Sequence, residues 1–159
     1  MRLFLSTFTN RIDKKGRVSV PASFRDAIRA AVPEGGFWGV VAFPSLAHEA
    51  IEGAGMDYIE RLTDSIDQFA PFTDEFDAFT ATILAASHQL GLDPEGRVVL
   101  PDELIAHAGL SDTVAFVGRG KTFQMWQPAR FHEYAAEARR TARDNRTSLR
   151  WPEPKGGSA

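Results

Sequence analysis

Four basic side chains surround a short turn near the start of the chain, and an aspartate begins that turn. Lys-Lys-Gly separates Asp13 from Arg17, and Arg11 lies two positions before the aspartate. Basic side chains at this density could bind the phosphates and base edges of a nucleic acid, or simply be solvated at a turn tip. Asp13 can accept hydrogen bonds from amides of its own turn. Arg11, Asp13, Lys14, Lys15 and Arg17 are therefore the residues of a candidate polyanion site, of which DNA would be one ligand.

The basic residues are concentrated at one end of the chain, although the formal net charge of the whole sequence is −3. Residues 1–30 contain seven basic and two acidic side chains, a local balance of +5. Residues 49–79 contain nine acidic side chains and a single arginine. Because a cluster of like charges sets the local potential, only the first segment is a candidate site for a polyanion.

The turn occurs twice in the sequence, 80 positions apart. Residues Asp13–Pro21 read Asp-Lys-Lys-Gly-Arg-Val-Ser-Val-Pro, and residues Asp93–Pro101 read Asp-Pro-Glu-Gly-Arg-Val-Val-Leu-Pro. A chance match of the shared Asp, Gly, Arg and Pro at fixed spacing has a probability on the order of 10⁻⁵ per position. The chain therefore contains one supersecondary unit in two copies. We call Asp13–Arg17 the first turn and Asp93–Arg97 the second turn.

The sequence offers little for catalysis. Residues Gly118–Thr122 end like a phosphate-binding loop, but Ala115 occupies the position where that loop needs its first glycine. The four histidines form no zinc-protease motif, and the absence of cysteine excludes thiolate nucleophiles and thiolate metal sites. A dispersed pair of carboxylates is the catalytic arrangement that stays open. We expect no enzyme, no cofactor, no metal site and no small-molecule substrate.

Each turn is expected to join two strands and to be followed by a helix. In the first copy, Phe8–Ile12 alternates like a strand, Gly16 can adopt the left-handed conformation that closes a hairpin, and Arg17–Val20 is the returning strand. Pro21 then suits the first turn of a helix. The second copy repeats this order, with Gly109 at the end of its helix. Further strands are expected at residues 39–43, 113–117 and 122–126, the last in the second copy only.

Helices are also expected between the copies and after the second one. Apolar residues recur at helical spacing from Ile59 to Phe69 and from Phe76 to Ala86, with acidic outer faces. A last helix is expected from about Pro128 into Arg143, before a flexible tail. Because neither copy could bury much apolar surface alone, each should complete the other's sheet. The expected fold is α+β, with one pseudo-symmetric barrel.

Length and composition are those of a small globular protein. The 159 residues, 43% of them hydrophobic, suffice for one compact domain or two packed halves. No apolar run approaches the roughly 18 residues of a membrane span, and the first residues do not resemble a signal peptide. We expect a cytoplasmic protein with no membrane partner.

The repeated Asp-x-x-x-Arg turn followed by Val-Ser-Val-Pro resembles the MraZ transcriptional regulators. The resemblance runs over nearly the whole chain and includes residues 8–21, Ser87–Leu90 and Phe116–Trp126. One such turn would indicate only the wider AbrB-like swapped-hairpin class. The resemblance implies two SpoVT/AbrB-like swapped-hairpin repeats and a ring-shaped homo-oligomer located in the cytoplasm and nucleoid. It also implies binding to repeated operator boxes in double-stranded DNA, as a repressor of the division and cell-wall operon, without a cofactor or catalysis.

Carried over by position, the two family motifs fall on Asp13 with Arg17 and on Asp93 with Arg97. The second copy departs from the first, because residues 93–103 balance at −3. We therefore expect the second turn to contact DNA weakly, and Arg97 to hold the turn or a neighbouring protomer. The resemblance implies a first AbrB-like repeat at 1–53, linking helices at 54–82, a second repeat at 83–129, a C-terminal helix at 130–144 and a flexible tail at 145–159.

The expected mechanism is a two-stranded ribbon that enters the major groove of DNA. Lys14 and Lys15 would bind phosphates, and Arg11 or Arg17 would read guanine edges. One turn offers few contacts, so several copies on one particle would supply the affinity for repeated boxes. Two alternatives stay open. One is a ring-forming scaffold whose basic turns hold the acidic helices of neighbouring copies, and the other is an antitoxin-type AbrB regulator.

Overall fold

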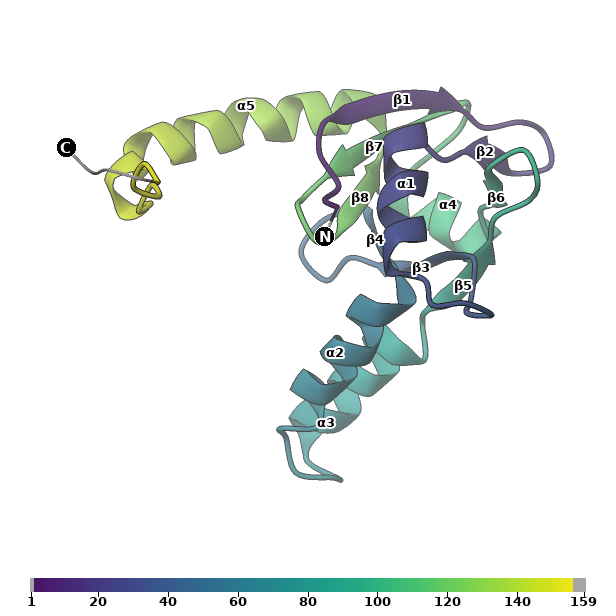
Figure 1. The fold of residues 1–159 in the computed structure, drawn as a ribbon, viewed down its shortest axis with the longest axis horizontal. Helices are drawn as coiled ribbons and strands as arrows, with labels where there is room; N and C mark the ends of the chain where they lie inside the picture. The colour runs from purple at the N-terminus through teal and green to yellow at the C-terminus, as the bar shows by residue number, and fades with distance from the viewer. Residues whose placement is uncertain (1, 156–159) are drawn as a thin grey trace. The chain divides into compact units, whose positions relative to one another are not determined.

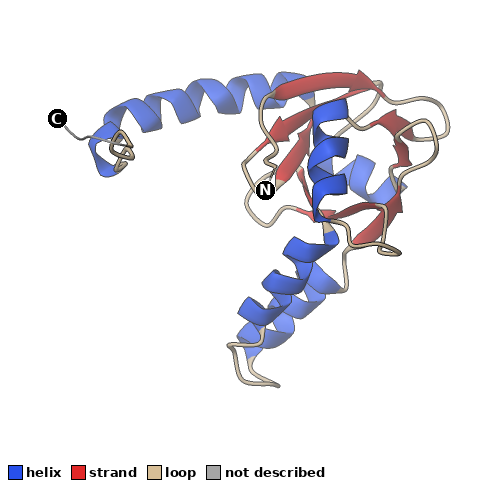
Figure 2. Cartoon of the chain, viewed as in Figure 1, coloured by secondary structure: helices blue, strands red, loops and turns tan. Residues whose placement is uncertain are grey.

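The computed structural model describes residues 2–155, which form one compact unit up to Pro128 and a second from Ala129 onward. The strands of the first unit are β1 (Thr7–Arg11), β2 (Arg17–Ser19), β3 (Gly39–Pro44), β4 (Ile51–Ala54), β5 (His88–Gly91), β6 (Arg97–Val99), β7 (Thr113–Gly118) and β8 (Phe123–Trp126) (Figure 1). Its helices are α1 (Ala22–Ala31), α2 (Met56–Ile66), α3 (Asp74–Phe79), which continues as the π-helical segment η1 (Thr80–Leu84), and α4 (Asp102–Ala108). This mixture of helices and antiparallel strands confirms the expected α+β class (Figure 2).

The two sequence copies share a single sheet. Six strands are hydrogen-bonded in the order β1-β7-β8-β4-β3-β5, and β2 pairs with β6 in a separate two-stranded sheet; all pairs are antiparallel. If each strand of the first copy (β1 to β4) is exchanged with its equivalent in the second copy (β5 to β8), the strand order of both sheets stays the same. The expectation that each copy completes the other's sheet is therefore confirmed.

The expected barrel is not closed by strand pairing. β1 and β5 are the two edges of the six-stranded sheet, and no strand ladder joins them within residues 2–155. Nor do β1 and β2 form the expected ribbon, because β1 pairs with β7 along its whole length. A single bridge, between Ile12 and Val18, joins β1 to β2. The pairing of β2 with β6 instead places Val18 and Val98, each 1% exposed, in the core.

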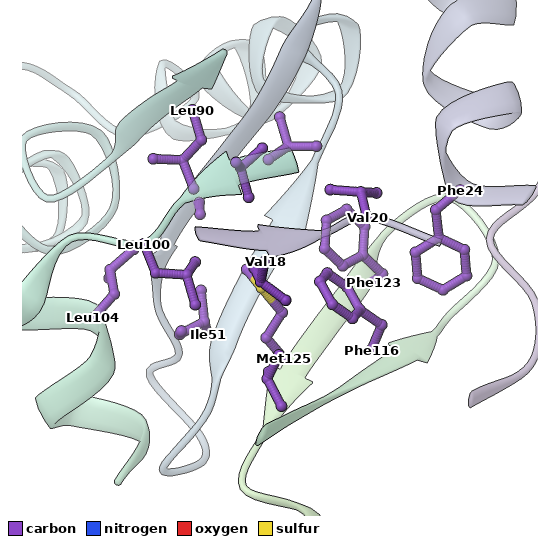
Figure 3. Packing of buried hydrophobic residues seen from close by; sticks show 14 of the residues in the cluster. Val18, Val20, Phe24, Ile51, Leu90, Leu100, Leu104, Phe116, Phe123 and Met125 are labelled. Atoms are coloured by element: carbon purple, nitrogen blue, oxygen red, sulfur yellow. The ribbon is translucent and has the colours of Figure 1, made fainter. Parts of the chain in front are cut away.

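Aromatic and aliphatic side chains from both copies fill this core (Figure 3). Phe24 of α1 lies 5.3 Å from Phe123 and 6.2 Å from Phe116, between ring centroids. Leu104 of α4 is fully buried in the same cluster. The prolines before the two helices and the glycine after α4 lie at the helix ends, as expected. Pro21 and Pro101 directly precede α1 and α4, and Gly109 ends α4 with a φ of 64°.

The second face of β3 is covered by the helices between the copies. Val41 and Phe43 pack with Ile59 and Ile66 of α2 and with Ile83 of η1. Two linking helices were expected here from the apolar spacing, and both are present, although they end at Ile66 and Leu84 and not at Phe69 and Ala86. Figure 1 shows α2 and α3 running side by side away from the strands. We call Met56–Leu84 the acidic hairpin, since seven of its eight charged side chains are carboxylates and all seven are exposed.

The strand β4 was not expected from the sequence, which assigned the equivalent strand to the second copy alone. β4 pairs with β3 on one side. On its other side it pairs with β8, the equivalent strand of the second copy. It has only four residues and contains Glu52 and Gly53, so its own pattern is weak. The expectation was wrong because pairing with both neighbours, and not local preference, holds this strand.

The second unit begins at Ala129, the second residue of α5 (Pro128–Asp144). A helix from about Pro128 into Arg143 was expected, and α5 is that helix. A single 3₁₀ turn, Arg146–Ser148, follows. Within the expected tail 145–159, residues 156–159 lie outside the described residues. None of the described helices combines the length and the apolar character that a bilayer crossing needs.

Candidate nucleic-acid interface

The first turn is held by one carboxylate. Oδ1 of Asp13 accepts hydrogen bonds from the backbone amides of Lys15 and Arg17, both at 2.9 Å. Its Oδ2 accepts a 2.6 Å bond from Nε of Arg17. The amide of Gly16 donates to the Asp13 carbonyl at 3.0 Å, and Gly16 has a φ of 79° that glycine adopts without a steric penalty. The Asp13 side chain thus fixes Lys15 and Arg17, and its carbonyl fixes Gly16.

The second turn has the same construction. Oδ1 of Asp93 accepts from the amides of Glu95 and Arg97, both at 2.9 Å, and Oδ2 accepts from Nε of Arg97 at 2.9 Å. Gly96 has a φ of 80°. One contact is particular to this turn, because Nη2 of Arg97 lies 3.6 Å from the Glu95 carboxylate. The two turns therefore share a backbone shape and differ in the charge at their tips.

These hydrogen bonds favour the ionised carboxylates. The backbone amide of Arg17 is the main cause that lowers the pKa of Asp13, and the Arg17 side chain adds to it. The amide and side chain of Arg97 lower the pKa of Asp93 in the same way. The hydrogen bond to Asp93 in turn raises the pKa of Arg97. Both ion pairs are consequently complete at neutral pH, and the aspartates have a structural task.

The two turns are also tied to each other. Leu100 donates its amide to the carbonyl of Gly16 at 2.8 Å, and Val20 donates to the carbonyl of Gly96 at 3.0 Å. These bonds extend the β2–β6 ladder at both ends. A change in the shape of one turn would therefore disturb the strand that leads out of the other.

Three basic side chains of the first turn and of β1, the strand that enters it, are exposed to solvent. Arg11, Lys14 and Lys15 are exposed, and no ion pair of theirs is found among residues 2–155. The equivalent tip positions of the second turn are Pro94 and Glu95. The structure thus brings the predicted cations together on one turn and its entering strand. Asp93 and Arg97 lie in the other turn, as expected.

Each turn has the helix of the other copy beside it, which could not be predicted from the sequence. A shallow hollow next to Lys14 and Lys15 is lined by Asp102 of α4 and by Asp112. Beside the second turn, a Cβ on Gly96 would lie 2.7 Å from Nη1 of Arg25 in α1. The acids beside the first turn and the arginine beside the second both reduce the charge difference between them. The pairing of β2 with β6 places Arg25 and Asp102 here, and Asp112 is held beside the first turn by the amide of Ile12, which donates to its carbonyl at 2.8 Å.

A rigid turn with outward lysines and arginines can bind phosphates and base edges, and it has no nucleophile or acid–base pair for catalysis. The Arg17 guanidinium already gives its Nε to Asp13, so its two Nη groups are the ones that can face a ligand. Within the described residues, no three histidine, aspartate or glutamate side chains gather as a metal site would need.

The chain is similar to known proteins along almost its whole length. A family model described as "MraZ protein, putative antitoxin-like" matches residues 83–151. A protein of Pelagibacter ubique named "Transcriptional regulator MraZ" is 46% identical over 149 residues, 94% of each chain. Proteins of the same name from Rickettsia bellii (strain OSU 85-389) and Rickettsia felis are 45% and 42% identical, over 94% of this chain and 98% of theirs.

Proposed function

This chain belongs to the MraZ family of transcriptional regulators, and on that premise we propose that its first turn binds double-stranded DNA. The observation that supports this most is that the two turns have the same backbone shape but differ in the charge of their tip residues. Asp13 and Asp93 hold their turns identically, so Lys14 and Lys15 are not needed for the turn itself. Their exposure beside Arg11 gives them a surface at which phosphate can bind.

The contact we propose divides the work between the side chains. Lys14 and Lys15 neutralise phosphates, which orients the turn on the duplex without reading its sequence. Arg11, or the Nη groups of Arg17, then reach guanine O6 and N7 in the major groove. Because β1 and β2 diverge after the Ile12–Val18 bridge, the inserted element is the turn and not a long ribbon. The second turn contributes weakly, since Glu95 would lie near phosphate.

Such a small contact needs repetition. Specific protein–DNA interfaces generally bury more surface than one turn offers, so we propose a ring-shaped homo-oligomer that engages several operator boxes at once. In this proposal the protein acts at the nucleoid, upstream of the division and cell-wall operon, as a repressor. It requires neither a cofactor nor a small-molecule substrate.

We also assign the two copies to the SpoVT/AbrB-like swapped-hairpin class. The first repeat then covers residues 1–53 and the second 83–129, with linking helices at 54–82, the C-terminal helix at 130–144 and a tail at 145–159. The exchange symmetry of the strand order supports this assignment, because each copy supplies the partner of the other's edge strand.

A salt titration tests the proposal. Gel shifts of the full-length protein on DNA from its own upstream region should show binding that weakens linearly in log–log form as salt rises, by about 0.9 in slope per neutralised phosphate. Unrelated DNA of equal length is the control for specificity. Absence of binding even at low ionic strength would contradict the proposal and favour the protein scaffold.

A further inference from the structure

The tip of the acidic hairpin carries an aromatic side chain that is almost fully in solvent. Phe72 is 92% exposed, the highest value among the exposed large hydrophobic residues of the described chain. Its neighbour Phe69 packs on Phe79, with ring centroids 5.5 Å apart. Phe72 thus contributes nothing to the core. Its exposure is consistent with a binding partner outside the hairpin.

The backbone at Phe72 is also unfavourable. The amide of Thr73 donates to the carbonyl of Ala70 at 3.3 Å, and Pro71 and Phe72 are the central residues of this turn. Phe72 has a φ of 68°. A turn with proline first and positive φ second calls for glycine or asparagine at the second position, and a bulky residue there is strained. Glycine would serve the fold better, which points to a role for the phenyl ring itself.

Acidic side chains surround this ring. Residues 62–79 contain five acidic side chains and no basic one. All five are exposed: Asp64, Asp67, Asp74, Glu75 and Asp77. The tip therefore presents a protruding apolar group within a strongly negative surface. A complementary partner would offer an apolar hollow with cations around it.

The same chain has such a hollow. It has a volume of about 190 Å³, with Phe4, Ala27 and Ile28 in its apolar floor. Arg2, Arg61 and Lys121 stand around it, together with one acid, Asp57. Arg2 also lies 3.7 Å from Asp26, and the Arg61 guanidinium lies 5.4 Å from the ring centroid of Tyr58. Lys121 is exposed and makes no ion pair among the described residues, so it is the cation most open to a second molecule. We call this site the charged hollow.

We propose that the Phe72 tip of one copy inserts into the charged hollow of a second copy. The tip cannot reach its own hollow, because Asp57 and Arg61 lie toward the start of α2 whereas the tip follows its end, and each helical residue adds about 1.5 Å. The contact is therefore head-to-tail, the kind that generates rings or filaments. Its closure into a ring rests on the function proposed above.

Light scattering in the absence of DNA tests this contact. The wild-type protein should have a mass several times that of one 17.5 kDa chain. Phe72→Gly relieves the backbone strain, so the variant stays folded, and it should fall to the mass of a single chain. Leu46→Ser is the matched control, because Leu46 is 61% exposed and lies outside both surfaces, and it should leave the mass unchanged. A Phe72→Gly protein of wild-type mass, or equal losses in both variants, would overturn the proposal.

A mixing experiment tests the direction of the contact. Lys121→Glu changes an exposed residue and should also give single chains, with its own tip intact. Mixed with Phe72→Gly, which keeps an intact hollow, it should form a species of two chains and nothing larger. Two folded variants that ignore each other on mixing would overturn the head-to-tail arrangement.

The contact and the DNA-binding function fail separately. If the wild-type protein assembles but does not bind its upstream DNA at low salt, the proposed function is contradicted and the contact stands. If Phe72→Gly keeps weak binding to one isolated box while losing tight binding to the array, both proposals are supported.

Discussion

Exchanging the tips of the two turns isolates the lysines from everything else in the fold. In Lys14→Pro/Lys15→Glu, the first turn receives the tip of the second turn. Asp13, Gly16 and Arg17 stay in place, and the same hydrogen bonds hold the second turn with proline and glutamate at its tip. The variant should therefore keep its stability and its assembly while losing two phosphate contacts.

The size of the effect follows from the number of contacts. Two lost phosphate contacts should reduce the slope of log affinity against log salt by about 1.8 for each engaged turn. Between 50 and 200 mM salt the wild-type affinity should then fall about tenfold further than that of the variant, again per engaged turn. The reverse change, Pro94→Lys/Glu95→Lys, should steepen the slope by a similar amount, because it adds two cations to a turn of the same shape.

Fluorescence anisotropy with labelled operator DNA at four or five salt concentrations measures these slopes. Unchanged light-scattering mass and thermal midpoint establish that each variant is intact. An intact Lys14→Pro/Lys15→Glu protein with the wild-type slope would refute the assignment of these lysines to phosphate.

Three further outcomes are expected. Gly16→Ala should lower the free energy of unfolding in urea by more than Gly35→Ala: both residues have positive φ, which costs roughly 1–2 kcal/mol with a side chain, but only the Cβ at Gly16 would lie 3.1 Å from a carbonyl oxygen. Equal losses of unfolding free energy in the two variants would show that the carbonyl oxygen does not crowd a Cβ at position 16. Arg17→Ala should abolish specific DNA binding while Arg97→Ala mainly lowers the urea midpoint, and the opposite result in folded proteins would reverse the assignment. The lowered pKa values of the two turn aspartates should stabilise the fold above about pH 3.9 and lose this contribution as pH falls through the lowered values, and unfolding titrations should show a weaker loss when both are changed to asparagine.

Features carried by neighbouring residues could be predicted from the sequence. The two turns depend on an aspartate, a glycine and an arginine within five positions, so a sequence match was enough to find them. The starts of α1 and α4 after Pro21 and Pro101 and the end of α4 at Gly109 follow from the same local chemistry. The amphipathic spacing of the linking helices predicted that Ile59, Ile66 and Ile83 are buried, but Phe69 of the same pattern lies beyond the end of α2 and is exposed.

Features carried by distant pairing were predicted in part or not at all. That the copies share a sheet followed from their small size, but the strand that each edge strand pairs with did not. The pairing of β2 with β6, and not with β1, could not be predicted, because residues 17–19 have the same sequence pattern in either arrangement. The prediction of a closed barrel was wrong because β2 pairs with β6 and leaves β1 at an edge of the six-stranded sheet. The strand β4 was missed because pairing with β3 and β8, and not its composition, holds it in the sheet.

For the candidate site, the sequence alone determined which side chains are present, their charge and the shape of each turn, since a turn of five residues is closed by its own hydrogen bonds. Tertiary structure alone decided what stands beside them. The acids Asp102 and Asp112 beside the first turn and Arg25 beside the second come from elements of the other copy. Likewise, Phe4, Ile28 and Lys121 meet in the charged hollow only after the chain has folded. Local hydrogen bonds can be deduced from sequence spacing, whereas neighbours that are distant in sequence depend on which strands pair, and burial of the shared core decides that pairing.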